Sequence, residues 1–346
     1  MQELKGLAMG IGSLPHKDAD SAINLIFKYL PEIPFWPQLP KRDIREGMIA
    51  QFSENFPFLK VDKDGLNFSM LDAKDKELEA FYEKIIANDI DHFKISQEYA
   101  LGLHKFYQRL ENLGPLGDTK FIKCQVTGPF TFASSIKDDL GNPLLHDEVL
   151  LQVVLKGLIM KANWQINMFR KFGKKMIMFF DEPYLSSFGS AYTPVNREDV
   201  VRVLSELTEA VKSPDVLLGV HCCGNTDWSI FMDVPKIDII SFDAFDFLDR
   251  LVLYSDNLKD FLGRGGILCW GIVPTQLFTG EETAELLIRK IRDGIFRLKD
   301  RGLEENLLLE NMLLSSSCGL GTFTPEKSEK VFKLLAEVSS LMRKYG

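Results

Sequence analysis

The segment HCCGN, which begins at His221, places a histidine and a cysteine two residues apart at the end of an apolar run. Side chains at positions i and i+2 of a strand point to the same face, so His221 and Cys223 can converge on one ion while Cys222 points away. Cys318 follows another apolar run and can complete the set, and Asp243 offers an oxygen ligand after a third. Thiolate sulfur together with imidazole nitrogen favours zinc over magnesium or calcium. The alternative is that the cysteines are small buried apolar residues and that His221 is a core histidine.

Other polar residues also follow apolar runs. Asp181 and Glu182 come directly after KMIMFF, where they suit either a role in a site or a solvated strand end or helix cap. The segment WPQLPKRD carries Gln38, Lys41 and Arg42, which suit contact with an anionic substrate or capping of the following helix. These residues need a fold that brings the ends of several strands together.

The chain alternates between apolar runs and helical patterns. Most of the runs are continuous rather than alternating, as expected for strands that are buried on both faces. The last helical pattern opens with Thr324 as the expected N-cap and Pro325 in the first turn. The strand candidates are the eight runs 7–15, 33–39, 121–129, 175–183, 216–223, 237–244, 267–274 and 311–318.

This order predicts a single (β/α)8 TIM barrel, an α/β fold, because parallel strands need helical crossovers and eight of them can close without leaving an edge. A doubly wound open sheet is the alternative. The interval at about 40–120 is longer than one crossover needs, so we interpret it as an insertion after the second strand. Residues 1–346 then form one catalytic barrel domain, with its chemistry at the C-terminal ends of the strands.

The composition excludes several classes of protein. Hydrophobic residues make up 45% and charged residues 26% of the 346 residues, which is typical of a globular chain with a sizeable core. The formal charge is −8 and no segment concentrates basic side chains, so we expect no nucleic-acid partner. No apolar run approaches the roughly 20 residues of a membrane helix, and the N-terminus does not have the pattern of a secretion signal. Five cysteines do not suggest a secreted disulfide framework, so we expect a cytoplasmic protein with no membrane partner.

Five short motifs resemble those of the cobalamin-independent methionine synthase family, within the larger group that includes uroporphyrinogen decarboxylase and the corrinoid-linked methyltransferases. They appear in the family's order and span almost the whole chain. Each is similar to a family motif, namely the opening Ile-Gly-Ser, the Thr-Gly-Pro turn, Asp-Glu-Pro, His-x-Cys and the final Cys-Gly-Leu. In this chain they read GIGSLPH (10–16), VTGP (126–129), DEP (181–183), HCC (221–223) and SCGL (317–320).

The resemblance assigns roles to residues of four of these motifs. A free thiol is mostly protonated at neutral pH, whereas a zinc-bound thiol is deprotonated, so zinc would generate the nucleophile. Asp181 suits the α-ammonium of homocysteine, and the backbone amides near Gly12 and Ser13 suit its carboxylate. The resemblance implies that zinc is bound by His221, Cys223 and Cys318, and that the amino-acid part of a thiol substrate is held by Ile11, Gly12, Ser13 and Asp181.

The chain also departs from the family. It is similar to the catalytic barrel alone, a short core form without the N-terminal barrel of the long synthases. Asp243 stands where the family has a glutamate ligand. The segment WGIVPT lacks the histidine thought to protonate a departing folate, and FTFASSI lacks the tryptophan that stacks on it. Because cobalt leaves without such protonation, a methylated corrinoid, carried by a corrinoid protein, is expected as the methyl donor rather than methyl-folate.

The leading hypothesis is therefore a zinc-dependent methyltransferase that activates homocysteine or a related thiol. A uroporphyrinogen decarboxylase-like enzyme is the first alternative, but it would need no metal and would hold several carboxylates with basic residues. A non-catalytic zinc-binding or thiol-binding protein is the second. Product formation by the isolated chain would separate an enzyme from the latter.

Overall fold

The computed structural model describes residues 4–70, 74–114, 116–190 and 193–344, and its main element is a curved parallel sheet. The strands follow the order β1-β9-β8-β7-β6-β5-β4, and every adjacent pair is parallel. This confirms an α/β fold built on a parallel sheet. The strands are β1 (Leu7–Ala8), β4 (Phe121–Thr127), β5 (Lys175–Asp181), β6 (Val216–Cys222), β7 (Ile239–Phe242), β8 (Ile267–Val273) and β9 (Met312–Ser316).

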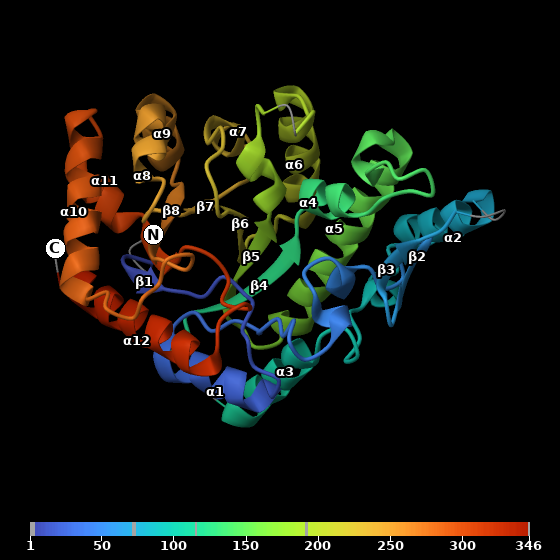
Figure 1. The fold of residues 1–346 in the computed structure, drawn as a ribbon, viewed down its shortest axis with the longest axis horizontal. Coiled ribbons are helices and arrows are strands. Elements are labelled where there is room, and N and C mark those ends of the chain that lie inside the picture. Colours follow the sequence, from blue (N-terminus) through green and yellow to red (C-terminus); the bar gives the residue numbers. More distant parts are fainter. Residues whose placement is uncertain (1–3, 71–73, 115, 191–192, 345–346) are drawn as a thin grey trace.

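Helices surround the outer side of the sheet (Figure 1). Thr324 caps the last of them as the sequence predicts, because its side chain accepts a hydrogen bond from the Lys327 N–H. The helices that follow the strands are α1 (Ala19–Tyr29), α4 (Pro129–Ser135), α5 (Glu148–Arg170), α6 (Arg197–Val211), α7 (Ser229–Met232), α8 (Leu248–Leu251), α9 (Ser255–Gly263), α10 (Ala284–Asp300), α11 (Glu305–Glu310) and α12 (Pro325–Met342).

The predicted strand 33–39 is not a regular strand, although it lies between β1 and β4. It makes two isolated parallel bridges, one between Phe35 and Lys123 of β4 and one between Gln38 and Ser13. The predicted strand 7–15 is likewise regular only over β1. The segment 33–39 is therefore paired with its two neighbours through single bridges, whereas the segment 7–15 forms a ladder only with β9.

Proline explains much of this irregularity. Pro34 and Pro37 have no backbone N–H, so neither residue can donate a hydrogen bond to a neighbouring strand. Other backbone groups still form hydrogen bonds between the two segments. The Gln38 N–H donates to the Gly12 carbonyl at 3.1 Å, and the Leu14 N–H donates to the Gln38 carbonyl at 2.9 Å.

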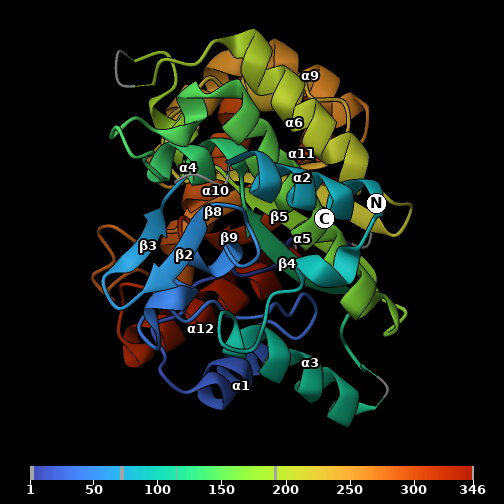
Figure 2. The same ribbon diagram turned by 90° about the vertical axis from the view of Figure 1, so that its right-hand side faces the viewer.

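The interval 40–120 contains its own elements, as the sequence suggested. Two short 3-10 helices, Ile44–Glu46 and Ala50–Phe52, precede an antiparallel hairpin of β2 (Leu59–Asp62) and β3 (Gly65–Phe68). The helices α2 (Lys74–Ile86) and α3 (Leu101–Leu113) follow. The hairpin and α2 lie far from α10 and α12 in Figure 1. Figure 2 views the molecule from the side of the hairpin.

Aromatic packing anchors this interval to the sheet's helices. The ring of Phe56 stacks on that of Phe132 in α4, with 5.3 Å between their centroids. It also fills the space above Gly157 of α5, where a Cβ would come within 2.3 Å of the ring. Any larger residue at position 157 would therefore displace the insertion from α5.

The two faces of the sheet carry different residues. On β5, Ile177 and Phe179 belong to a small apolar cluster on the inner, concave face, whereas Met178 belongs to the large cluster beneath the helices. Alternation along the strand then places Asp181 on the inner face at the strand's C-terminal end. His221 of β6, which is paired in register with Asp181, lies on the same face at the same end of the sheet.

A helix that could span a membrane is not found among the described residues.

Candidate functional site

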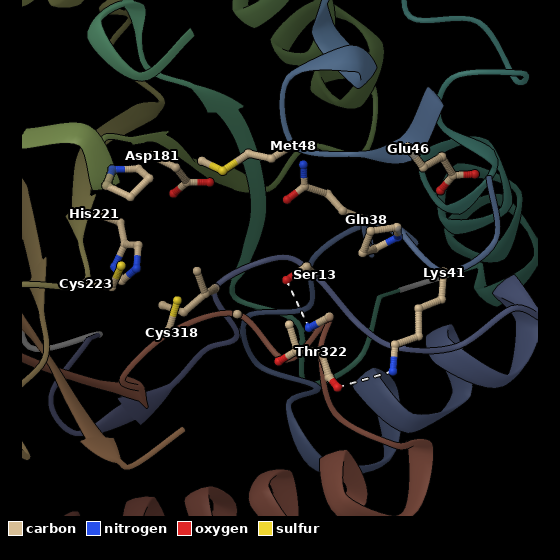
Figure 3. Close-up of a pocket in the computed structure, with 15 residues that line it drawn as sticks. Ser13, Gln38, Lys41, Glu46, Met48, Asp181, His221, Cys223, Cys318 and Thr322 are labelled. Carbon is tan, nitrogen blue, oxygen red and sulfur yellow. Dashed lines mark hydrogen bonds between the residues drawn. The ribbon is translucent and has the colours of Figure 1, made fainter. Parts of the chain in front are cut away.

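Three predicted ligands come together at the C-terminal ends of two strands. His221 lies one residue before the end of β6, Cys223 lies directly after it, and Cys318 lies two residues beyond β9. One ligand atom from each of the three lies within 4.8 Å of the others, and we call these residues the His-Cys cluster (Figure 3). Cys222 faces away, as predicted, with its thiol directed to the Gly224 carbonyl at 3.8 Å.

The imidazole of His221 is held in one orientation. Its Nδ1 lies 3.0 Å from the hydroxyl of Ser241, the residue opposite it on β7. Its Nε2 is buried and has no hydrogen-bond partner in the described parts of the chain. Metal-binding histidines characteristically use one ring nitrogen for an orienting hydrogen bond and the other for the metal. The exposed fraction of His221 is 3%, so water does not readily satisfy this nitrogen.

The two thiols of the cluster shift each other's pKa in opposite directions. Cys318 donates a hydrogen bond to Cys223, which lowers the pKa of the Cys223 thiol. The same interaction, together with burial, raises the pKa of the Cys318 thiol, while nearby His221 acts in the opposite direction. The pair therefore provides one thiolate more readily than either thiol would alone, and a cation beside it would favour the second.

Asp243 follows β7 on the same end of the sheet but does not join the cluster. Its Oδ1 accepts a hydrogen bond from the Asp246 N–H at 2.9 Å. Burial raises the pKa of this carboxyl to about 6. Its assignment as a fourth metal ligand stays a prediction.

Asp181 faces the His-Cys cluster from the end of β5. It is paired in register with Thr127 on one side and His221 on the other. Its side chain is 6% exposed, and its Oδ1 has no hydrogen-bond partner among the described residues. Burial raises the pKa of Asp181, while nearby Lys123 and His221 act in the opposite direction. A buried carboxylate oxygen without a donor is expensive unless a ligand supplies one.

Glu182 serves a different purpose from its neighbour. Its carboxylate accepts hydrogen bonds from the Phe130 N–H at 3.0 Å and from the Thr131 N–H at 2.8 Å, in the first turn of α4. It also accepts one from the Thr131 hydroxyl at 2.6 Å. Of the two roles considered for this acidic pair, Glu182 is thus the helix cap and Asp181 faces the site.

A cavity of about 520 Å³ opens beside the His-Cys cluster, large enough for a small metabolite and part of a second reactant. Of the residues of the Ile-Gly-Ser motif, Ile11 and Ser13 line it and Gly12 does not. The complete lining is Ile11, Ser13, Gln38, Pro40, Lys41, Glu46, Met48, Asp181, Pro183, His221, Cys223, Cys318, Gly319, Gly321 and Thr322.

The basic residues after the segment 33–39 do not offer their charges to the cavity. The Lys41 ammonium donates to the carbonyls of Thr322 at 3.2 Å and Phe323 at 2.5 Å. Arg42 pairs with the buried Glu46. Both side chains thus fasten loops together, and neither is placed as an anion-binding group.

Sequence reasoning missed two residues that shape this site. Lys123 of β4 is buried, and its ammonium donates to the Ile11 carbonyl at 2.5 Å and to Gln125 at 3.1 Å. The signal was available, because positions 123 and 125 share one face of an otherwise apolar strand. Met48 lies beside Asp181 in Figure 3, and the Thr127 hydroxyl donates to its carbonyl at 2.7 Å. No local pattern places this insertion residue over the cavity.

No protein-family model matches this chain, and no curated protein matches its sequence.

Proposed function

We propose that this protein is a zinc-dependent thiol methyltransferase that activates homocysteine or a related thiol. The observation that carries the proposal is one cavity lined both by the His-Cys cluster and by the unpartnered oxygen of Asp181. A metal held by the His-Cys cluster would bind a thiol, and the Asp181 oxygen would accept a hydrogen bond from an ammonium group. An amino-acid thiol carries both groups a few bonds apart.

The residues of the cluster fit zinc. Imidazole nitrogen and two thiol sulfurs are ligands that zinc prefers, and three protein ligands are typical of catalytic zinc sites. The buried Nε2 of His221 is satisfied if it binds a metal, and Ser241 already fixes the ring. Bound zinc would supply Lewis acidity that keeps a substrate thiol in its thiolate form at neutral pH.

The chain's own residues would bind and orient the substrate. Asp181 accepts hydrogen bonds from the substrate ammonium and so fixes the position of the amino acid relative to Cys223 and Cys318. The burial of Asp181 and His221 keeps water from these groups, which strengthens the ionic contact.

The methyl donor that we propose is a methylated corrinoid, presented by a corrinoid protein, rather than methyl-folate. The aromatic residues after the Thr-Gly-Pro turn, Phe130 and Phe132, are 1% and 0% exposed and belong to the core. They offer no stacking surface to a pterin. The segment after β8 has no histidine, and among the described residues lining the cavity the only histidine is His221.

A uroporphyrinogen decarboxylase-like activity is less well supported. That activity would bind several carboxylates through basic groups, whereas Lys41 is the only lysine or arginine among the described residues of the cavity. Its ammonium is held by two carbonyls.

We also propose the finer assignments on which this function rests. Residues 1–346 would form one catalytic barrel domain similar to that of the methionine synthase-like group, and the domain would be cytoplasmic. The segment 33–39 would act as the second strand of a closed (β/α)8 barrel. Its bridges to Ser13 on one side and to Lys123 on the other support this arrangement.

The test is a donor comparison. Zinc-loaded protein is incubated with homocysteine and equal concentrations of methylcobalamin or methyl-tetrahydrofolate, and methionine is followed by mass spectrometry. We expect methionine from the corrinoid and little or none from the folate. Efficient transfer from the folate alone would overturn the donor assignment. Binding of homocysteine without product from either donor would favour a thiol-binding protein instead.

A further inference from the structure

A second cavity, of about 560 Å³, also reaches the His-Cys cluster. Cys318, Gly319 and Thr322 line both cavities, so the loop after β9 is a boundary that the two share. Neither Asp181 nor any residue of the Ile-Gly-Ser motif lines the second cavity. Its other lining residues belong to the loop after β8 and to the beginning of α12, and they are Thr275, Gln276, Phe323, Thr324 and Lys327.

The walls of the second cavity are held by hydrogen bonds and by ring stacking. The Thr275 N–H donates to the Ser317 hydroxyl at 3.0 Å, which joins the loop after β8 to the residue before Cys318. The rings of Phe278 and Phe323 stack with 6.1 Å between their centroids, which joins the same loop to the beginning of α12. These walls are therefore in place before a ligand enters, which lowers the cost of binding one.

Lys327 is the only lysine, arginine or acidic residue among the described residues that line the second cavity. Its ammonium lies 4.8 Å from the centroid of the Phe323 ring and 5.7 Å from that of Phe278. Within the described parts of the chain it forms no ion pair. Gln276 and Thr322 are exposed and add an amide and a hydroxyl. An ammonium beside neutral hydrogen-bonding groups favours a ligand that presents oxygen acceptors.

Methyl transfer requires the donor to approach the thiolate sulfur from a direction that the acceptor does not occupy. In the proposed reaction the carbon chain of the acceptor extends from this sulfur towards Asp181, in the first cavity. The second cavity offers another direction, because it meets the cluster at Cys318. In a methylated corrinoid, the face that carries the methyl group also carries acetamide side chains, and their carbonyls are oxygen acceptors.

We propose that the second cavity is the methyl-donor site, where Lys327 and Gln276 bind acetamide side chains on the methyl-bearing face of the corrin ring. This inference rests on the proposed function and locates its donor over the loops that follow β8 and β9. A cavity of about 560 Å³ holds one edge of the ring. The rest of the cofactor stays outside, where a corrinoid protein can hold it.

The experiment measures donor binding and thiol binding separately. Zinc-loaded wild type, Lys327→Met and Gln276→Leu are titrated with methylcobalamin by equilibrium dialysis and with homocysteine by calorimetry. We expect methylcobalamin to bind roughly tenfold more weakly to Lys327→Met and several-fold more weakly to Gln276→Leu, the scales of a charged and a neutral hydrogen bond. Homocysteine should bind all three proteins equally.

The matched control is Lys330→Met, which removes an exposed lysine in the next turn of α12 that does not line the cavity. It should bind both ligands as wild type does. Zinc content and thermal midpoint establish that the variants are folded.

The inference is overturned if wild type binds no methylcobalamin, if Lys327→Met binds it as tightly as wild type, or if this variant loses homocysteine affinity to the same extent. Methyl-tetrahydrofolate is titrated in parallel. A loss in Lys327→Met that is confined to the folate would mean that Lys327 binds a carboxylate, and the corrin assignment would be wrong. Methylcobalamin that binds through Lys327 without yielding methionine would refute the proposed function and leave the binding site standing.

Discussion

The first cavity has two halves that are built in different ways. The half that carries the His-Cys cluster lies at the ends of β6 and β9, which are strands paired with their neighbours over several residues. The other half carries Ser13 and Gln38 on segments that pair through a single bridge. In the first half, the strand ends bring the ligands together, and the Ser241 hydroxyl fixes the ring of His221. In the second half, hydrogen bonds from side chains and backbone hold the segments in place.

Because of this difference, the two halves should respond differently to substitutions. A ligand on a regular strand keeps its direction when a neighbouring residue changes, because the ladder fixes the backbone. The irregular half depends on particular side chains, such as Lys123 on the Ile11 carbonyl and Gln51 on Gln38. We therefore expect substitutions in the first half to act on metal binding and those in the second half to act on substrate binding.

The largest effect is expected for the ligands themselves. Wild-type protein should hold about one zinc per chain, and Cys318→Ala and Cys223→Ser should lose most of it, because each removes one of three converging ligands. Metal analysis of the purified proteins measures this directly.

The matched control is Cys222→Ala. This cysteine is adjacent in sequence and fully buried, but it points to the outer face of the sheet. It should retain zinc. The metal assignment would be abandoned if Cys318→Ala and Cys223→Ser retained as much zinc as this control.

An intermediate effect is expected for Asp181, which lies where the two halves meet. Asp181→Asn keeps the size of the side chain but removes the charge opposite the substrate ammonium. It should retain zinc and weaken homocysteine binding by about 2 kcal/mol, the usual scale of a charged hydrogen bond. Calorimetry with zinc-loaded protein gives both values, and an unchanged affinity would refute this role.

The two halves also differ in how much of their structure could be predicted from the sequence. The cluster was predictable because His221 and Cys223 obey the two-residue period of a strand, and because parallel strands end at one edge. The orientation of Gln38 was not predictable, since it depends on Gln51 and on the carbonyl of Tyr99, far along the chain in the insertion. The irregular backbone of 33–39 was partly predictable, because its prolines remove ladder donors.

The smallest effect is expected for Lys123, and it should appear as a dependence of stability on pH. Burial lowers the pKa of this lysine from 10.5 to about 8 in the folded protein. Between these two values the unfolded chain binds more protons than the folded one, so the free energy of unfolding gains a contribution that increases with pH. Lys123→Met removes this contribution.

The free energy of unfolding of the wild type minus that of Lys123→Met should therefore increase by about 1 kcal/mol per pH unit from pH 8 to 10. Urea denaturation at several pH values measures it, with Lys120→Met, a more exposed lysine just before β4, as the control. A difference that stayed constant with pH would mean that Lys123 does not reside as a buried amine beneath the Ile-Gly-Ser turn, and the irregular half of the cavity would need another support.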